Sequence, residues 1–451
     1  MASDAANDWH VESVAAILMI STFAVFVQAY LFIKLAVLSM FVCACVIRVA
    51  VGRAVPVYPR LFWFYGVVCV AGIVWSMVGL LYRGTFTDGV LDALRLYCLW
   101  SGAFLLLYSL LRASTSLRVF HTSLATAGII ISLMNLFGVA DQFYGWNVIP
   151  ESVRRELELY VGINDGYVQI TSINIGMLFV IVPYLMTMQL RVDASRWHSA
   201  MSRVSLGLCL VLVVASGRRA LLLVVALTPF LVLLIAQLTS STGLLRRTSR
   251  RLITAYCICA VGVVGLASAL PASIQESGYV YRLKSAFSAQ DERTIQKAYL
   301  IDSFIDVPLF GSGFGAYAGY RRSDERPWTY ELTYHKMLFN LGLVGMSLVG
   351  GIHLAYLAMV GRLLRRYQEN SAAAFSLLVG VCSLLLGAWS NPYLGSFDYL
   401  FFLGMLPYLA TFRNGFTPFA LLPSAHEDGP DSTLIATVPD GGFSLRGECE
   451  C

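Results

Sequence analysis

The sequence predicts an all-α, polytopic integral membrane protein with about 12 transmembrane helices and a large, partly helical external loop before the tenth. Three observations predict this class. Of the 451 residues, 57% are hydrophobic and only 13% are charged, whereas soluble proteins contain ~45–50% apolar and ~25% charged residues. The apolar residues also fall in runs close to the ~20 residues with which a helix crosses a bilayer.

The net charge and the hydrophobicity exclude two classes of protein. The chain carries 32 Lys and Arg against 27 Asp and Glu, a net charge of +5. So small a surplus excludes a polybasic nucleic-acid binder, and the high hydrophobicity excludes a disordered chain. The expected environment is therefore the lipid bilayer, and no nucleic-acid partner is expected.

Twelve apolar runs mark the predicted spans. The first thirteen residues lack Lys and Arg and carry Asp4, Asp8 and Glu12. The positive segment of a signal peptide is thus missing, and the first run is expected to be the first span. The runs are 14–33, 35–51, 61–81, 90–111, 118–138, 171–190, 204–217, 220–237, 252–270, 335–361, 373–390 and 397–412.

The distribution of arginine predicts the orientation. Fifteen arginines lie beside or within the loops that follow spans 2, 4, 6, 8 and 10, and the short loops between them carry few. Positive loops stay in the cytoplasm, so both termini are expected there. The long loops at about 139–170 and 271–334 are then external. Residues 1–412 form the predicted membrane domain, and 413–451 form a flexible cytoplasmic tail.

The second long loop is expected to be partly structured. An apolar stripe at helical spacing predicts a helix over about 291–306. Pro308 and a glycine cluster at Gly311, Gly313 and Gly315 follow it. No βαβ pattern surrounds these glycines, so they are interpreted as turn formers rather than as a dinucleotide-binding fingerprint. Neither long external loop contains cysteine, which excludes a disulfide-stabilised exterior.

Two adjacent arginines stand where the topology does not require them. Arg218 and Arg219 interrupt an apolar run at the predicted outer end of spans 7 and 8. One interpretation is a turn whose long side chains reach the interface and anchor the helices. The other is an anion site, because guanidinium groups bind phosphate through paired hydrogen bonds.

The start of span 10 holds a second cluster. Glu331 lies four residues before His335, on the same face if the helix begins early, so the carboxylate can orient an imidazole that acts as a base. Lys336 follows directly. Tyr330 and Tyr334 flank the acid, and an interfacial aromatic belt is the alternative interpretation of both.

Three further charges are weaker candidates. Arg293 lies in the predicted external helix, where ordinary solvation explains most arginines. Arg95 follows Asp92 by three residues, a spacing at which the two can simply pair. Asp398 follows the Asn-Pro-Tyr turn before the last span, at the external mouth, where a proline-containing hairpin is the alternative interpretation.

These residues together resemble the bacterial O-antigen polymerase and O-antigen ligase superfamily. The resemblance covers roughly residues 170–360, with the N-terminal third similar only in topology. Lys336, where the family often has Asn, and Arg219, where it has a small residue, depart from the pattern. The segments are Gly217-Arg218-Arg219-Ala220, Arg293-Thr294-Ile295 leading to Pro308-Leu309-Phe310-Gly311-Ser312-Gly313, and His335 followed by Asn340-Leu341-Gly342-Leu343-Val344-Gly345.

The resemblance implies a lipid-donor glycosyltransferase of the bacterial inner membrane whose active site faces the periplasm. Its donor would be a glycan on undecaprenyl pyrophosphate. A polymerase joins such repeat units into O-antigen, capsule or exopolysaccharide, and the tyrosine-rich start of span 10 favours it. A ligase transfers the glycan to lipid A-core instead. A flippase is disfavoured because the candidate charges gather at the outer face rather than through the membrane depth.

The resemblance also implies roles for the residues. Arg218, Arg219 and Arg293 would bind the diphosphate without metal or cofactor, and His335 or Glu331 would take the proton of the acceptor hydroxyl. Partners would be the lipid-linked donor, the acceptor glycan or lipid A-core, the bilayer and other polysaccharide-assembly proteins. The secondary candidates for substrate binding are Tyr330, Tyr334, Lys336, Arg95 and Asp398.

Overall fold

A computed structural model of the chain is almost entirely helical in its described part, with a single two-stranded sheet. The described residues are 11–27, 29–50, 59–82, 85–100, 102–103, 107–108, 117–164, 167–189, 196–239, 292–322, 324–366, 371–389 and 391–410. The predicted ninth span at 252–270 and the predicted tail at 413–451 lie outside these residues.

A helix lies at each of the other eleven predicted spans. Within the fourth, the α-helix continues from Arg95 as a π-helix, a wider turn than expected. The elements in chain order are α1 (Val11–Val25), α2 (Leu31–Ala50), α3 (Pro59–Leu81), α4 (Thr87–Leu94), π-helix η1 (Arg95–Trp100), α6 (Leu117–Tyr144), α7 (Glu151–Glu156), β1 (Tyr160–Asn164), β2 (Tyr167–Thr171), 3-10 helix η2 (Ile173–Met177), α8 (Leu178–Met188), α9 (Arg196–Ala215), α10 (Arg219–Leu238), α14 (Glu292–Asp306), α15 (Thr333–Arg366), α16 (Ser371–Gly387), 3-10 helix η4 (Tyr393–Gly395) and α17 (Phe397–Ala410).

Four described helices are long and apolar enough to cross a membrane. They cover Phe62–Leu81, Val119–Tyr144, Arg219–Leu238 and Thr333–Arg365. Six further apolar helices are shorter, including those at Leu31–Ile47 and Ile173–Met188. The membrane character of the chain thus has direct support, while the count of twelve spans and their orientation stay predictions.

The first helix boundary differs from the prediction. Helix α1 ends at Val25 rather than near residue 33, and the chain turns through Tyr30, whose φ is +50°. The Tyr30 N–H donates to Glu156 Oε1 at 3.0 Å, which fixes the turn. Lys34, expected between two spans, therefore lies inside α2. A buried partner for its charge, described below, explains why the helix accommodates it.

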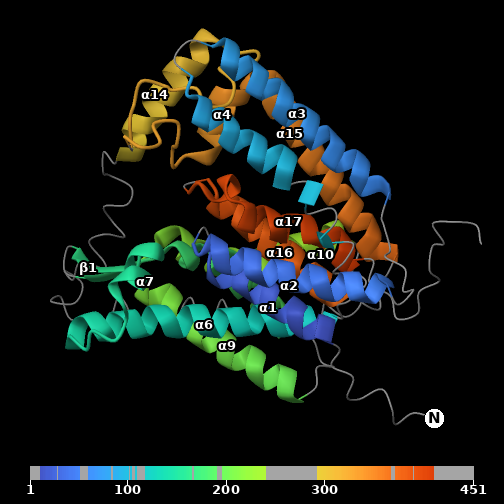
Figure 1. Ribbon diagram of the computed structural model, residues 1–451, viewed down its shortest axis with the longest axis vertical. Coiled ribbons are helices and arrows are strands. Elements are labelled where there is room, and N and C mark those ends of the chain that lie inside the picture. Colours follow the sequence, from blue (N-terminus) through green and yellow to red (C-terminus); the bar gives the residue numbers. More distant parts are fainter. Residues whose placement is uncertain are drawn as a thin grey trace, which may run out of the picture.

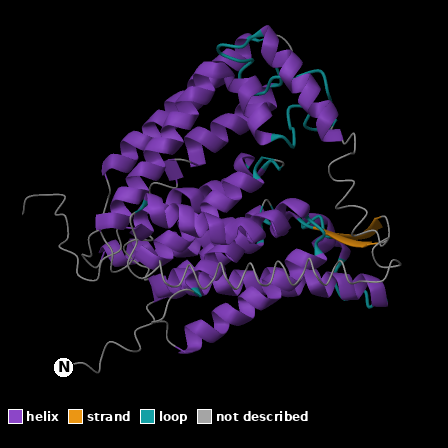
Figure 2. Cartoon of the chain, turned by 180° about the vertical axis from the view of Figure 1, so that it is seen from behind, coloured by secondary structure: helices purple, strands orange, loops and turns teal. Residues whose placement is uncertain are grey.

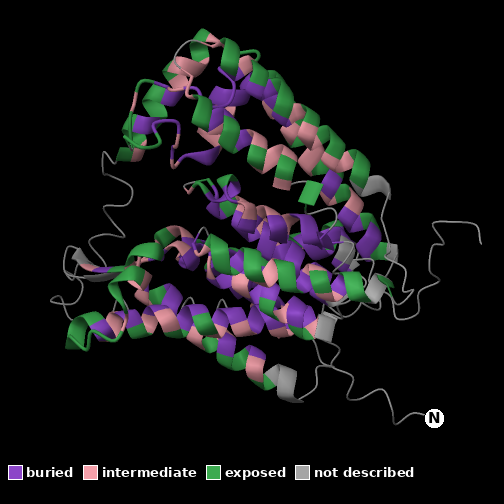
Figure 3. Ribbon diagram, viewed as in Figure 1, coloured by how far each residue is buried: buried purple, intermediate pink, exposed green. Residues whose placement is uncertain are grey.

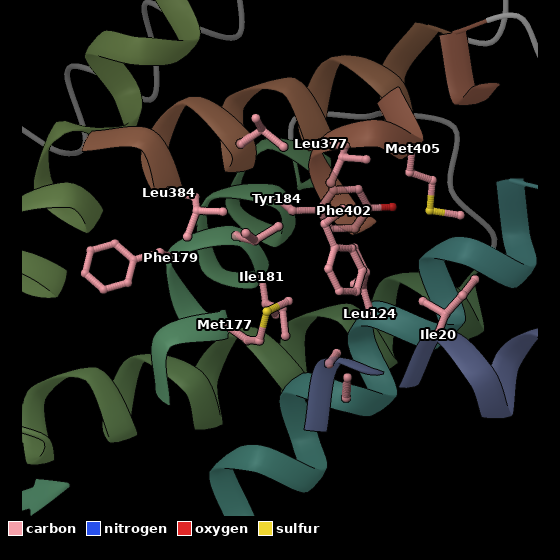
Figure 4. Packing of buried hydrophobic residues seen from close by; sticks show 14 of the residues in the cluster. Ile20, Leu124, Met177, Phe179, Ile181, Tyr184, Leu377, Leu384, Phe402 and Met405 are labelled. Carbon is pink, nitrogen blue, oxygen red and sulfur yellow. The ribbon is translucent and has the colours of Figure 1, made fainter. Parts of the chain in front are cut away.

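The largest apolar core surrounds α8. Every residue from Leu178 to Leu185 in this helix is buried. Figure 3 shows buried residues gathered along α16, which packs against α8. A helix that is hydrophobic on all sides is either enclosed by other helices or faces lipid. Helix α8 is enclosed, since it packs against α6, α9, α10 and α16. Figure 4 shows Phe179, Ile181 and Tyr184 of α8 among side chains from α6, α16 and α17.

The helices form two groups (Figure 1). One contains α3, α4, α14 and α15, and the other contains α1, α2, α6, α9, α10, α16 and α17. Contacts of α15 with α16 and α17 join them. The β1–β2 hairpin lies to one side of the helices (Figure 2) and pairs Tyr160 with Thr171 at its open end.

Helix α14 confirms the helix predicted at about 291–306, and the glycines after it are turn formers, as predicted. Gly311, Gly313 and Gly315 have φ values of +68°, +76° and +81°, which glycine adopts without strain. The segment from 307 to 316, here called the glycine loop, inserts into a break of α15 at Gly342, where φ is +63°.

Backbone hydrogen bonds join the glycine loop to this break. Ser312 and Gly313 N–H donate to the carbonyls of Phe339 and Asn340 at 2.9 and 2.8 Å. In the opposite direction, Leu343 N–H donates to Pro308 O at 2.9 Å. The backbone groups of α15 freed by the break are thus satisfied by another part of the chain, as buried backbone N–H and C=O groups require.

Candidate functional site

Arg218 lies at the start of α10. Gly217, with φ +63°, turns the chain sharply after α9, and Arg218 then takes an extended conformation as the residue before α10. Its guanidinium donates from Nη2 to the Ser172 carbonyl at 3.2 Å and from Nη1 to Tyr393 Oη at 3.4 Å. No carboxylate in the described residues forms an ion pair with Arg218. Its charge therefore stands at the positive end of the α10 dipole without an acidic partner.

Arg293 lies on the first turn of α14 and faces the beginning of α15. Its Nε donates to Glu331 Oε2 at 2.8 Å. The other oxygen of Glu331 accepts from Arg322 Nη2 at 2.6 Å. One carboxylate therefore holds two guanidinium groups, one from α14 and one from the segment between the glycine loop and α15.

Tyr393 lies in the turn that Arg218 contacts. Its phenol is nearly buried in the turn before α17, and its ring contacts Phe179 with centroids 5.3 Å apart. Burial raises the pKa of Tyr393, and the positive charges of Arg218 and Arg293 oppose this rise. The turn that carries Tyr393 also contacts the start of α15, because Thr333 Oγ1 donates to the Asn391 carbonyl at 2.7 Å. Arg218 therefore contacts the same turn that the segment following Glu331 contacts.

Glu331 does not orient His335. Helix α15 begins at Thr333, so Glu331 precedes it, and the shared helix face expected from the i, i+4 spacing is wrong. Both carboxylate oxygens of Glu331 are instead bound to arginines. The favourable pairing with two guanidinium groups outweighs any attraction to a neutral imidazole.

His335 lies in the first turn of α15. Its ring meets the edge of Trp389, with centroids 5.8 Å apart, and it is close enough to Lys297 of α14 for electrostatic interaction. Its Nδ1 is buried and has no hydrogen-bond partner within the described residues. An unpaired imidazole nitrogen can accept a proton or a hydrogen bond from a ligand.

Three secondary candidates have structural partners. The Tyr330 hydroxyl is buried and accepts a hydrogen bond from the Ala318 N–H at 2.8 Å. The Tyr334 hydroxyl donates to the Leu385 carbonyl at 2.6 Å. Asp398 is fully buried, and both its oxygens lie 3.0 Å from Lys34 Nζ. These contacts account for all three residues without a ligand.

Of the remaining candidates, Arg219 and Arg95 are exposed and Lys336 is half-buried. Arg219 is exposed in the first turn of α10. Arg95 pairs with Asp92 at 3.6 Å, the simple pairing that their spacing allows. Lys336 follows His335 in the first turn of α15 and is close enough to Asp92 for electrostatic interaction.

Sequence reasoning missed Arg322 and Gln296, and it considered Tyr393 only as part of a turn. Arg322 sits in a segment with other arginines, so no local pattern distinguishes it. Gln296 follows Arg293 by three residues, a spacing that places both on one side of α14. The spacing was therefore an available signal for Gln296. A glutamine on this side of the helix is stabilised by burial only when its amide is hydrogen-bonded.

Comparison with known proteins finds neither a protein-family model nor a curated protein that matches this chain. The described residues contain no group of three or more His, Cys, Asp or Glu side chains placed to hold a metal ion. The case for a function therefore rests on the residues and their contacts.

Proposed function

We propose that the chain is a membrane glycosyltransferase that polymerises undecaprenyl-pyrophosphate-linked oligosaccharide repeat units at the periplasmic face of the bacterial inner membrane. The observation that carries this proposal is Arg218, whose guanidinium bonds to Tyr393 in the same short turn that accepts a hydrogen bond from Thr333, next to the Glu331 ion pair of Arg293. Arg218 has no acidic partner among the described residues and stands at a helix N-terminus. A positive charge placed at a helix N-terminus favours an anionic ligand.

The reaction would need little beyond these groups. A hydroxyl oxygen of the acceptor glycan attacks the anomeric carbon of the donor, and the bond from that carbon to the phosphate oxygen breaks. The diphosphate leaves with the bonding electron pair, and its negative charge is stabilised by Arg218 and Arg293. The proton of the attacking hydroxyl passes to the imidazole of His335, whose Nδ1 lacks a partner in the described residues.

The structure changes the division of roles that the residue pattern suggested. Glu331 is occupied by two arginines, so His335 is the better proton acceptor and Glu331 is a positioning residue. The lipid tail of the donor would lie beside the apolar helices, such as that at Phe62–Leu81, which expose large apolar side chains. Helix α14 would then lie over the sugars at the outer face.

An assay with the purified chain in lipid nanodiscs tests the proposal. The substrate is a defined repeat unit on undecaprenyl pyrophosphate, and the products are separated by length. We expect Arg218→Gln to lower the rate by about 100-fold or more, as loss of a charge-stabilising donor does. Arg155→Gln removes an equally basic, exposed side chain of α7 and should leave the rate unchanged. The site is wrong if Arg218→Gln and His335→Ala both keep full activity.

The same substrate separates the alternatives. A ligase would transfer the glycan only when lipid A-core is added, and it would not lengthen the lipid-linked chain. A flippase would move the lipid-linked unit across the bilayer of a vesicle without forming a new glycosidic bond. A polymerase is expected to give a ladder of products from lipid-linked units alone.

A further inference from the structure

Arg322 forms the other half of the Glu331 ion pair. It lies between the glycine loop and α15, and its Nη2 is 2.6 Å from Glu331 Oε1, while Arg293 Nε is 2.8 Å from Oε2. The two arginine side chains are 40% and 42% exposed, and that of Glu331 is 20% exposed. One negative charge between two positive charges leaves a net charge of +1 at a partly solvated position.

Both guanidinium groups keep unused donors. Arg293 donates through Nε alone and Arg322 through Nη2 alone in the described contacts. Each guanidinium carries five N–H donors in a planar arrangement. Several donors of each side chain are therefore available for a second anion without loss of the bonds to Glu331.

Helix α14 holds Glu331 in place from behind. The backbone N–H of Glu331 donates to Gln296 Oε1 at 3.1 Å, and Gln296 is fully buried. Gln296 Nε2 in turn donates to Glu292 Oε1 at 3.3 Å, and the same oxygen accepts from Tyr320 Oη at 2.9 Å. These bonds connect α14, the segment that carries Arg322 and the start of α15. The two arginines are thus oriented before any ligand arrives, which lowers the entropic cost of binding.

Hydrogen bonds connect Arg218 with the Glu331 ion pair through one short turn. Arg218 bonds to Tyr393, and two residues before it the Asn391 carbonyl accepts from Thr333 Oγ1 at 2.7 Å. Glu331 precedes Thr333 by two residues and pairs with both Arg293 and Arg322. A ligand with two phosphates offers one phosphate to Arg218 and the other to the arginine pair.

We propose that Arg322 is a third diphosphate-binding residue, which together with Arg293 binds the second phosphate of a polyprenyl diphosphate, and that Glu331 positions both arginines. This inference rests on the proposed function. The inference predicts a difference in affinity between two lipids. Arg218 contributes to the binding of a lipid with one phosphate and of a lipid with two, whereas Arg322 contributes only to the binding of the lipid with two phosphates.

Binding of two lipids to the full-length chain in nanodiscs tests this. The probes are undecaprenyl phosphate and undecaprenyl pyrophosphate. Arg322→Gln should weaken pyrophosphate binding by about tenfold, because a hydrogen-bonded charge pair is lost, and should change monophosphate binding by less than about twofold. Glu331→Gln should also reduce the preference for undecaprenyl pyrophosphate over undecaprenyl phosphate, because Arg293 and Arg322 lose the carboxylate that both contact.

Arg321→Gln is the matched control. Arg321 is the neighbouring residue, is 59% exposed, and pairs only loosely with Asp324 at 4.0 Å in the described contacts. Its loss removes the same charge and should change neither affinity. This comparison separates a specific contact from a general fall in positive potential.

The outcomes are distinguishable. If the unmodified chain does not prefer the pyrophosphate lipid, the proposed function fails and this inference fails with it. If the preference exists and Arg322→Gln keeps it, the inference alone is overturned. Equal weakening of both lipids by Arg322→Gln, with a lower melting temperature, would assign Arg322 a structural role and also overturn the inference.

Discussion

Helix α8 and the second half of the glycine loop, residues 311–316, are both buried, but they are held by different interactions. Helix α8 contacts its neighbours through apolar side chains, and Leu178–Leu185 are buried throughout. The glycine loop joins α3 and α15 mainly through backbone hydrogen bonds, such as Gly313 N–H to Asn340 O and Phe314 N–H to Trp75 O. Apolar packing needs the correct volume, whereas backbone pairing at close range needs a particular conformation. The two regions should therefore respond differently to changes of similar size.

The largest effect is expected from Gly313→Ala. A Cβ at Gly313 would lie 2.0 Å from the Gly79 nitrogen of α3, and φ at this residue is +76°. Backbone atoms cannot move aside as a side chain can, so the loop would separate from α3. We expect a loss of about 4 kcal/mol or more in the free energy of unfolding, measured by denaturation of the purified protein in mixed micelles.

Gly319→Ala is the control for conformational strain. Gly319 also has a positive φ, +83°, but the nearest atom to its added Cβ is Tyr299 Cδ1 at 3.3 Å. The variant should lose only the strain, about 1–2 kcal/mol. Equal losses in the two variants would show that close approach to α3 contributes nothing.

The next largest effect is expected at a buried ion pair between two otherwise apolar helices. Lys34 of α2 and Asp398 of α17 form a buried ion pair, and Ser396 Oγ donates to the same carboxylate at 3.3 Å. Asp398→Ala leaves Lys34 buried without its counter-ion and should cost about 3–5 kcal/mol. Denaturation measures the loss. The double variant Lys34→Met with Asp398→Leu should regain most of it, and failure to do so would show that the pair supplies more than mutual neutralisation.

The sequence predicted those features that follow from patterning. Apolar runs located eleven described helices, and the stripe from Ile295 to Ile305 located α14 within a residue or two. Adjacent arginines in an apolar context identified Arg218. Each of these signals comes from residues that are close together in the sequence, and the helix or site it indicates depends on the same neighbouring residues.

Long-range pairing was beyond the sequence. Lys34 lies within α2 because Asp398, more than three hundred residues away, neutralises it. Glu331 faces Arg293 and Arg322 because α15 begins at Thr333, a boundary that no cap residue announces. The break at Gly342 depends on the glycine loop, which supplies the missing hydrogen bonds from another segment. Partners of this kind depend on the fold and not on spacing.

A smaller effect is expected from Tyr330→Phe. The variant leaves the Ala318 N–H buried without its acceptor and should cost about 1–2 kcal/mol. It should leave glycan synthesis unchanged at temperatures where the protein stays folded, because Tyr330 is enclosed beside α14. A loss of activity without a loss of stability would instead restore Tyr330 as a substrate-binding residue.

The pH dependence of stability offers a second measurement of Tyr330. Burial raises the pKa of Tyr330 to about 12 from an ordinary value of 10.0, and the hydrogen bond from Ala318 N–H opposes the rise. The folded state thus holds this proton more tightly than the unfolded state. Its contribution is complete below about pH 10 and is lost as the pH approaches 12. Tyr330→Phe should reduce the alkaline loss of stability over that interval.

The smallest effect is expected from Ile181→Val in the centre of α8. The change removes one methylene from a fully buried side chain, and such losses cost about 1 kcal/mol. Gly313→Ala differs by one carbon as well, yet its expected cost is several times larger, because neighbouring side chains relax around a small cavity and backbone atoms cannot yield to an added methyl group. Denaturation of the two variants under the same conditions measures this ratio directly. If Ile181→Val proved as costly as Gly313→Ala, the packing around α8 would be as rigid as the glycine loop, and the distinction between the two regions would fail.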